Sequence, residues 1–308
     1  MNKQLIILSS LMLFSICAWS QQVAFTKDQI IAITPEWSDE RLADGRPKVS
    51  DELLERLKNI SIEEAWGTLR NKGFNNQFEG NWTIMDKSEP MVGRALTVQY
   101  LPKRKDFDDL VRAKGKEENR IGNFNSWPID MLQNGDIYVA DCFNKIVDGT
   151  LIGDNLGNAI FSKSKKGVVF YGSLRDDEGL EEIEGFNFWT KGTDPSYLQE
   201  VMLGGINTPI RIGRASVLPG DAVLAKKSGV IFIPAYLVEE VVLNSEFVSL
   251  RDKFGHMRLR EGKYTPGQID QQWTDAIKDD FINWLDKNPD LLPMSRAELD
   301  AYMKNRTW

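Results

Sequence analysis

The sequence predicts an α/β protein with helical segments at both ends and a centre rich in short strands. Apolar residues recur at helical spacing up to Gly73, and beyond it they follow the period of strands. Residues 167–172 form a short apolar run between glycines, which is typical of a strand buried on both faces. From residue 236 onward the helical spacing returns. These observations predict a sheet joined by crossover helices, followed by a helical extension.

The first twenty residues have the pattern of a secretory signal peptide. Lys3 precedes an apolar or small run over residues 5–19, and Ala18-Trp19-Ser20 is a small-x-small cleavage pattern. A membrane anchor is the alternative, but the run is shorter than the roughly 20 residues that a bilayer requires. Lipidation of Cys17 is a second alternative, which the large residue before it disfavours. We therefore expect an exported protein, periplasmic or secreted, without a membrane span after cleavage.

Composition limits the chemistry of the remaining chain. With 38 Lys plus Arg against 45 Asp plus Glu, the net charge is −7 and no basic stripe is present, so nucleic acid is not an expected partner. Only Cys142 follows the predicted leader, so no intrachain disulfide is expected. His256 is the sole histidine, which excludes multi-histidine metal sites and most nucleophile–histidine pairs. A metal would be a hard cation held by oxygen atoms: magnesium, manganese or calcium.

The N-terminal part should be helical. Residues 51–57 and 61–69 have helical spacing, and Ser61 with Glu64 forms a capping box at the start of the second helix. Strands are expected over 81–85 and 94–101, the latter starting after Gly93, and a helix over 106–114. We divide the chain into a signal peptide (1–20), an N-terminal helical segment (21–60), a catalytic domain (61–260) and a C-terminal helical extension (261–308).

The centre should consist of short strands and helices. The turn Asn134-Gly135 precedes a strand, and further glycines and prolines separate the elements that follow. We expect strands or extended segments over 136–141, 147–152, 167–172, 186–191, 210–212, 221–225 and 230–234, and helices over 155–163 and 177–183.

Three helices should complete the chain, over residues 236–251, over 268–286 and from Ser295-Arg-Ala-Glu298 onward. Trp273, Ile277, Phe281 and Trp284 lie on one face of the second. This stripe either packs on the core or a neighbouring subunit, or it forms a platform for sugars.

The candidate site lies between Gly153 and Asp176. Gly153 begins the segment Gly-Asp-Asn-Leu-Gly-Asn-Ala, where an extended segment turns into a helix whose first amides are free to bind an anion. Arg175 and Asp176 follow the strand after that helix, so both loops should meet at the carboxyl edge of the sheet. The amides of Asn155 and Leu156 could hold a carboxylate. Arg175 could neutralise an oxyanion, and Asp176 could position a divalent ion.

Simpler interpretations exist for each of these residues. Asp154 and Asp176 could each cap a helix, and Arg175 could be a surface ion-pair partner. The general base also stays open at this point. Asp154 acting through a bound water, Tyr171, or a residue of a neighbouring subunit are the candidates.

The same residues carry a resemblance to RraA-like proteins and 4-hydroxy-4-methyl-2-oxoglutarate aldolases. The similar segments are Gly153-Asp-Asn-Leu-Gly-Asn-Ala, Val168-Val-Phe-Tyr-Gly-Ser-Leu-Arg-Asp176, Val92-Gly-Arg-Ala-Leu-Thr-Val98, Asn134-Gly-Asp-Ile-Tyr-Val-Ala-Asp141, Leu218-Pro-Gly-Asp-Ala-Val223 and Gly229-Val-Ile-Phe-Ile-Pro234. The resemblance implies a three-layer α/β/β domain, trimers or hexamers with sites between subunits, and class II pyruvate aldolase chemistry with magnesium or manganese.

The resemblance also implies roles for the site residues. Arg175 would be the catalytic arginine that stabilises an enolate, Asp176 the metal-positioning carboxylate, and Asp154 the catalytic carboxylate that orients a metal-bound water. Gly153, with the amides of Asn155 and Leu156, would bind the substrate carboxylate together with Arg175. The family's aldolases complete the site with a glutamate from a neighbouring subunit, and no residue here matches it.

Three functions are compatible with this pattern. The first is a lyase, most simply a dehydratase, that acts on uronic-acid-terminated oligosaccharides. The second is a retro-aldolase or decarboxylase of a small oxo-acid, and the third is a binding protein without catalysis. The predicted export favours the first, because uronic acids are common carboxylates outside the cytoplasm whereas free oxo-acids are scarce. Each requires a small carboxylated ligand.

Overall fold

A computed structural model of the chain describes residues 22–85 and 89–304. The predicted signal peptide and Cys17 lie outside these residues. Within them, Cys142 is a buried free thiol, and no helix is both long and apolar enough to cross a membrane.

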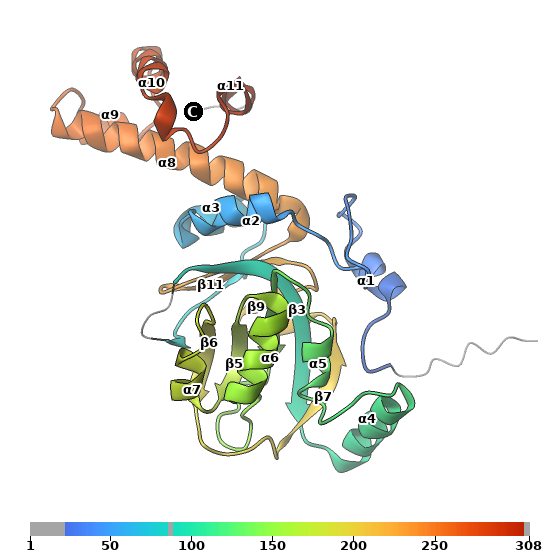
Figure 1. Cartoon of the computed structure of the whole chain (residues 1–308). Coiled ribbons are helices and arrows are strands. Elements are labelled where there is room, and N and C mark those ends of the chain that lie inside the picture. The colour runs from blue at the N-terminus through green and yellow to red at the C-terminus, as the bar shows by residue number, and fades with distance from the viewer. Residues whose placement is uncertain (1–21, 86–88, 305–308) are drawn as a thin grey trace, which may run out of the picture.

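A nine-stranded mixed sheet forms the centre of the molecule (Figure 1). Its strands follow the order β1, β11, β10, β3, β4, β5, β6, β2, and β7 pairs with β3 in addition. Neighbouring strands from β3 to β6 are parallel, whereas the other pairs are antiparallel. The strands are β1 Phe78–Glu79, β2 Thr83–Ile84, β3 Met91–Pro102, β4 Asp136–Asp141, β5 Val168–Leu174, β6 Phe188–Thr193, β7 Val201–Ile206, β10 Ala222–Lys226 and β11 Gly229–Ile233.

Two layers cover the parallel strands. On one face lie α4 (Lys105–Glu117), α5 (Trp127–Asp130), α6 (Asp154–Ser164) and α7 (Asp177–Glu181), and on the other lies the small sheet of β8 (Ile210–Ile212) and β9 (Ala215–Val217). All residues of β4 are buried, and their side chains alternate between the two faces: Tyr138 and Ala140 pack with the helices, and Ile137 and Val139 pack toward β8 and β9. This arrangement confirms the predicted α/β fold class with its three α/β/β layers.

A further helical layer lies over β10 and β11. It consists of α2 (Asp51–Lys58), α3 (Ile62–Asn71) and the first turns of α8 (Val238–Arg260), which share a buried apolar core with those strands. The predicted capping box begins α3: Glu64 N donates to Ser61 Oγ at 3.1 Å, and Ser61 N donates to Glu64 Oε2 at 3.1 Å. A short helix α1 (Lys27–Ile33), which the sequence pattern did not separate, precedes this layer.

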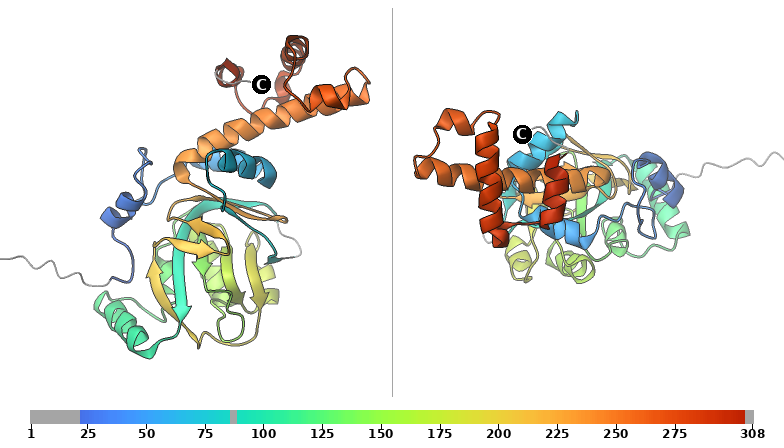
Figure 2. Two further views of the ribbon diagram at one scale, coloured as in Figure 1. Left: turned by 180° about the vertical axis from the view of Figure 1, so that it is seen from behind. Right: turned by 90° about the horizontal axis from the view of Figure 1, so that it is seen from above.

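The C-terminal elements form a separate helical unit on the far part of α8, which extends beyond the sheet (Figure 2). It contains α9 (Pro266–Ile269), α10 (Asp275–Lys287), the single turn η2 (Pro289–Leu291) and α11 (Arg296–Lys304), whereas the turn η1 (Ala235–Leu237) precedes α8 and packs in the core with α2 and α3. Trp273, Ile277, Phe281 and Trp284 are buried in its core, so they pack as core residues and the sugar platform is wrong. The single helix predicted over 268–286 is also wrong, because Thr274 is extended and caps a new helix.

The strands of the structure differ from the sequence predictions at several places. β3 begins at Met91 rather than after Gly93, because Met91 and Val92 pair with β10. Residues 147–152 form no strand and contribute one bridge, from Thr150 to Ser173. The sequence pattern missed β7, whose Gly204-Gly205 pair interrupts the apolar alternation.

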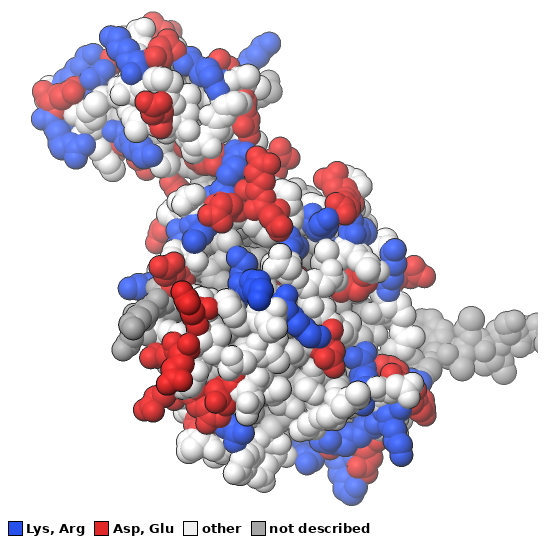
Figure 3. Space-filling view, viewed as in Figure 1, with Lys and Arg blue, Asp and Glu red and all other residues white. Residues whose placement is uncertain are grey.

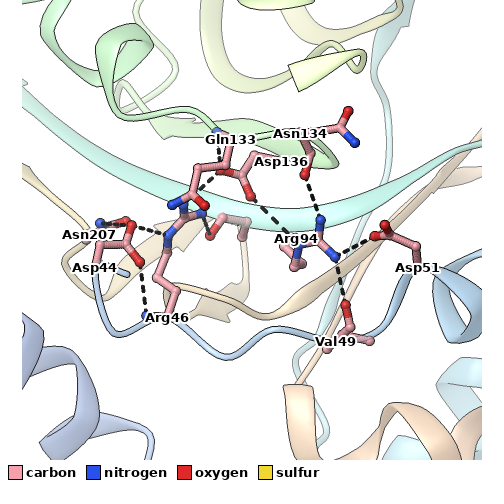
Figure 4. A network of polar contacts seen from close by, with 10 residues as sticks. Asp44, Arg46, Val49, Asp51, Arg94, Gln133, Asn134, Asp136 and Asn207 are labelled. Atoms are coloured by element: carbon pink, nitrogen blue, oxygen red, sulfur yellow. Dashed lines mark hydrogen bonds and ion pairs between the residues drawn. The ribbon is translucent and has the colours of Figure 1, made fainter. Parts of the chain in front are cut away.

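Buried charges tie the N-terminal segment to the sheet (Figure 4). Arg46, which is fully buried, contacts Asp136 at 2.8 Å and Asp44 at 2.7 Å. Arg94 contacts Asp51 at 2.8 Å and lies 3.9 Å from Asp136. Burial raises the pKa of Asp136 even though Arg46 opposes that shift. This carboxyl therefore depends on its arginine partner to stay ionised inside the protein.

The molecular surface carries both signs of charge. Figure 3 shows basic and acidic side chains interspersed on the face that Figure 1 presents, with acidic side chains gathered around α7, where Asp177 and Glu178 begin the helix.

Candidate functional site

The first turn of α6 forms one wall of the candidate site. Gly153 is extended and occupies the N-cap position, and the helix begins at Asp154 with the bond from Gly157 N to Gly153 O at 2.9 Å. Asp154 therefore does not occupy the cap position. Its Oδ1 instead accepts a hydrogen bond from Asn155 N at 2.7 Å. Of the two amides predicted to bind a carboxylate, that of Asn155 is thus engaged by Asp154, which leaves the Leu156 amide at this helix end.

The second wall follows β5. Leu151 N donates to Ser173 O, and Arg175 N donates to Ile152 O, each at 3.0 Å. These bonds join the loop before α6 to the end of β5. The sequence prediction that the two loops lie side by side at the carboxyl ends of the strands is therefore confirmed.

Gly153 permits this close approach. A Cβ atom on Gly153 would lie 2.2 Å from Asp176 Oδ2 and 3.2 Å from Arg175 Nε, so any side chain there would displace the carboxylate. Arg175 Nε and Asp176 Oδ2 are 3.5 Å apart. Glycine at this position thus allows the Asp176 carboxylate to lie against the loop before α6.

Asp176 has an unusual backbone. Its φ of 57° and ψ of 42° place it in the left-handed region, which is uncommon for residues other than glycine and is often found at functional sites. It precedes α7, yet its side chain makes no capping hydrogen bond. Asp176 thus occupies the N-cap position of α7 but does not cap the helix with its side chain, and its carboxylate faces Arg175.

The two walls enclose an open pocket of about 250 Å³. Its floor and sides include residues that the sequence analysis did not select: Asn123, Asn125, Thr150, Leu151, Ile152, Tyr197 and Leu198. The Arg175 guanidinium lies 5.0 Å from the centre of the Tyr197 ring, which is 63% exposed. This cation–π contact holds the guanidinium in place and leaves its N–H groups available.

Hydrogen bonds bring the additional residues to the pocket. Asn125 Nδ2 donates to Leu151 O at 2.7 Å and so holds the loop before α6. Thr150 Oγ1 donates to Ser196 O at 2.6 Å, which places the next residue, Tyr197, beside Arg175. These contacts join distant parts of the chain, and no local pattern in the sequence indicates them.

Tyr171 lies elsewhere. It belongs to the opposite face of β5, where its ring packs edge-on against Trp82 at 6.3 Å and lies 5.1 Å from Lys191 Nζ. It does not line the pocket. Of the candidate bases that the sequence left open, Tyr171 is therefore excluded within this chain's pocket.

The donor atoms suit a hard divalent cation. Asp154 and Asp176 both line the pocket, and magnesium is commonly bound by one or two carboxylates with water and substrate oxygens completing its shell. Among the residues that the structure describes, no group of three or more His, Cys, Asp or Glu could hold a metal ion by itself. Asp176 or Asp154 would therefore supply only part of the coordination.

Two curated proteins are similar to parts of this chain. The curated protein DlpA of Legionella pneumophila is 28% identical over 203 residues, covering 65% of this chain and 30% of that protein. A 4-hydroxy-4-methyl-2-oxoglutarate aldolase of Thermus thermophilus is 30% identical over 84 residues, covering 27% of this chain and 51% of the aldolase. The chain thus spans less than two thirds of the length of these relatives.

Solved structures share the fold. Streptomyces coelicolor RraAS2, described as an unusual member of the RNase ES inhibitor RraA family, matches with a TM-score of 0.58 and 25% identity, over 68% of this chain and all of that one. A structure described as novel cellulases from gut-associated microbes matches with a TM-score of 0.59 and 21% identity over 74% of this chain and 96% of that one, which shows the fold alone.

The match to a family model covers most of the sheet and the whole of the candidate site. The model of RraA-like proteins, described as Aldolase/RraA, matches residues 46–232. This range includes Gly153, Asp154, Arg175 and Asp176 and exceeds half of the chain. The chain therefore belongs to the RraA-like family.

Proposed function

We propose that the chain is a lyase that stabilises an enolate beside a carboxylate. The observation that supports this most directly is the meeting of Arg175, Asp176 and the first turn of α6 in one open pocket. The Arg175 guanidinium beside the Leu156 amide is suited to a substrate with a carboxylate and an oxygen that gains negative charge during reaction. The family relatives named as aldolases support the same class of chemistry.

In this proposal each residue has a separate task. The α6 terminus, through the Leu156 amide, binds the substrate carboxylate, and Arg175 donates hydrogen bonds to the neighbouring oxygen as that oxygen becomes negative. Asp176 would hold magnesium or manganese, and Asp154 would orient a water molecule beside it. When bound, such a cation polarises the carbonyl group. The exposed ring of Tyr197 packs against the Arg175 guanidinium and keeps it oriented.

The reaction that the relatives favour is retro-aldol cleavage of a small 4-hydroxy-2-oxo acid. A base removes the hydroxyl proton, the bond between the third and fourth carbons breaks, and its electron pair forms the enolate of the released oxo-acid. That enolate then takes up a proton at its third carbon to give pyruvate or a homologue. Asp154 acting through a water is the base that the pocket offers from this chain.

Dehydration of a terminal uronic acid is the second candidate. It would use the same charge stabilisation after removal of the proton beside the carboxylate, followed by loss of a β-hydroxyl group. The exposed Tyr197 ring at the pocket is an observation that favours it, since aromatic faces pack well against sugar rings. The predicted export of the protein also favours the dehydratase.

A parallel assay tests both candidates. The protein is offered 4-hydroxy-4-methyl-2-oxoglutarate, oxaloacetate and uronate-terminated oligosaccharides, each with chelator and with magnesium or manganese added back. We expect pyruvate from an oxo-acid, loss of that activity with chelator and recovery with the cation. A new ultraviolet absorbance from the oligosaccharides, without pyruvate, would select the dehydratase instead. Absence of any product under all these conditions would mean that the pocket is not catalytic.

We also propose that the chain assembles as a homotrimer or hexamer. Two carboxylates of one chain give an incomplete metal shell, and the family resemblance implies a further carboxylate from a neighbouring subunit. Light scattering at micromolar concentration should give a mass that is three or six times that of the chain. A monomer with full activity would contradict the shared site.

A further inference from the structure

A second pocket, larger and more apolar than the first, lies beneath the N-terminal segment. Its volume is about 390 Å³, within the range of small-molecule sites. The segment that follows α1 forms one wall, and residues around β9, β10 and β11 form the other. The apolar lining is Ile33, Pro35, Trp37, Pro47, Phe74, Leu218, Pro234 and Ala235.

Asp221 is a buried carboxyl group in the wall of this pocket. Its local structure repeats that of Asp136: each aspartate follows a glycine at the start of a strand and accepts a bond at 2.8 Å from the amide three residues earlier. Arg46 contacts Asp136, whereas no lysine or arginine among the described residues forms an ion pair with Asp221. Asp221 thus has the backbone amides of Leu218 and Ala235 as its partners, and it borders the pocket without a cation beside it.

The other polar side chains that line this pocket are Thr34, Glu36, Gln77, Ser216 and Tyr236, and none of them is a lysine, arginine or histidine. Gln77 uses its Nε2 to donate to Ser216 O at 3.2 Å and to Phe232 O at 3.0 Å, which leaves its Oε1 as an acceptor. Glu36 and Tyr236 also line the pocket. An anionic ligand would meet unfavourable charge here, whereas a positively charged donor would be stabilised.

We propose that this pocket binds a small organic amine, with its apolar body between Trp37 and Phe74 and its ammonium group against Asp221. The ligand would supply the positive charge that Arg46 supplies to Asp136. Because the site lies apart from Arg175 and Asp176, this inference does not depend on the lyase proposal.

Titration calorimetry with 2-phenylethylamine tests the proposal, with 2-phenylethanol and phenylacetate as the neutral and anionic controls. The amine should bind to one site per chain at least tenfold more tightly than the alcohol, and phenylacetate should not bind there. The amine should bind more tightly because a hydrogen bond from a charged donor to a buried carboxylate is stronger than one from a neutral hydroxyl group. Equal affinities for amine and alcohol would overturn the role of Asp221.

Two variants locate the binding. Asp221→Asn should weaken amine binding at least tenfold, and Ser216→Trp should fill the pocket and abolish binding while leaving Asp221 untouched. Ser216 is exposed and contributes its backbone oxygen, not its side chain, to Gln77. Asp275→Asn, at a 97% exposed carboxylate, is the matched control and should bind as the parent does. Retained amine binding in Ser216→Trp would overturn the proposal. The proposal would also be overturned if the parent bound no amine and Ser216→Trp changed the oligomeric mass.

The pH dependence of binding provides an independent test. Burial raises the pKa of Asp221 to about 7, although the amides of Leu218 and Ala235 oppose the shift. Glu36, Tyr236 and the more distant Lys72 are the titratable groups near this wall. A rise from pH 6 to 8.5 should ionise Asp221 and tighten amine binding about tenfold, while Asp221→Asn should show no such change. A parent profile as flat as that of the variant would contradict the proposal.

Discussion

Replacing Arg46 with methionine should lower the free energy of unfolding by about 3–5 kcal/mol, because the change leaves a buried carboxylate without its cation. Arg46 and Asp136 both have fully buried side chains and lie 2.8 Å apart. Arg94 cannot take over, since its Nε is 3.9 Å from Asp136 and its other nitrogen atoms bind Asp51, Val49 O and Asn134 O. Urea denaturation followed by circular dichroism measures the loss.

A double replacement separates the loss of the pair from the loss of packing. Arg46→Met with Asp136→Leu removes both charges, so it should be clearly more stable than Arg46→Met alone. Arg104→Met is the matched control, because the pair of Arg104 with Asp106 is largely exposed at 77% and 68%, and its stability should match that of the parent. If Arg46→Met behaved like Arg104→Met, the buried network would not anchor the N-terminal segment.

The sequence predicted best the elements whose ends are set by residues nearby in the chain. β4 has the predicted bounds, because the turn at Asn134-Gly135 sets its start and Gly135 adopts the positive φ of 84° that such a turn needs. The capping box of α3 is equally local. The break between α9 and α10 was missed because the helical spacing of aromatic residues continues through a segment whose backbone is extended at Thr274.

The candidate site was predictable only in part. Gly153, Arg175 and Asp176 could be placed together because a single helix and strand separate them, and a parallel crossover has few geometries. Tyr197 and Asn125 reach the pocket through bonds between loops far apart in the chain, which sequence spacing does not encode. The same applies to Asp221: its turn resembles that of Asp136, but only tertiary packing shows that one has an arginine partner and the other a pocket.

The catalytic proposal leads to the second large effect. Arg175→Lys should reduce turnover roughly a hundredfold to a thousandfold, equivalent to about 2.7–4 kcal/mol, if the guanidinium stabilises the developing oxyanion with more than one N–H. The lysine keeps the charge but lacks the planar fork that stacks over Tyr197 at 5.0 Å. The steady-state rate of pyruvate release, or of unsaturated uronate formation, measures the effect.

The matched control for this variant is Arg70→Lys, because Arg70 also lies 5.0 Å from an aromatic ring, that of Trp66, outside the pocket. Both variants should retain the melting temperature of the parent, since Arg175 is 36% exposed and its removal leaves no buried charge. Only Arg175→Lys should lose activity, and the loss should appear mainly in kcat, because the bonds to the oxygen strengthen as it becomes negative. A loss confined to KM would mean that Arg175 only holds the substrate carboxylate, whereas equal activity in both variants would remove it from the mechanism.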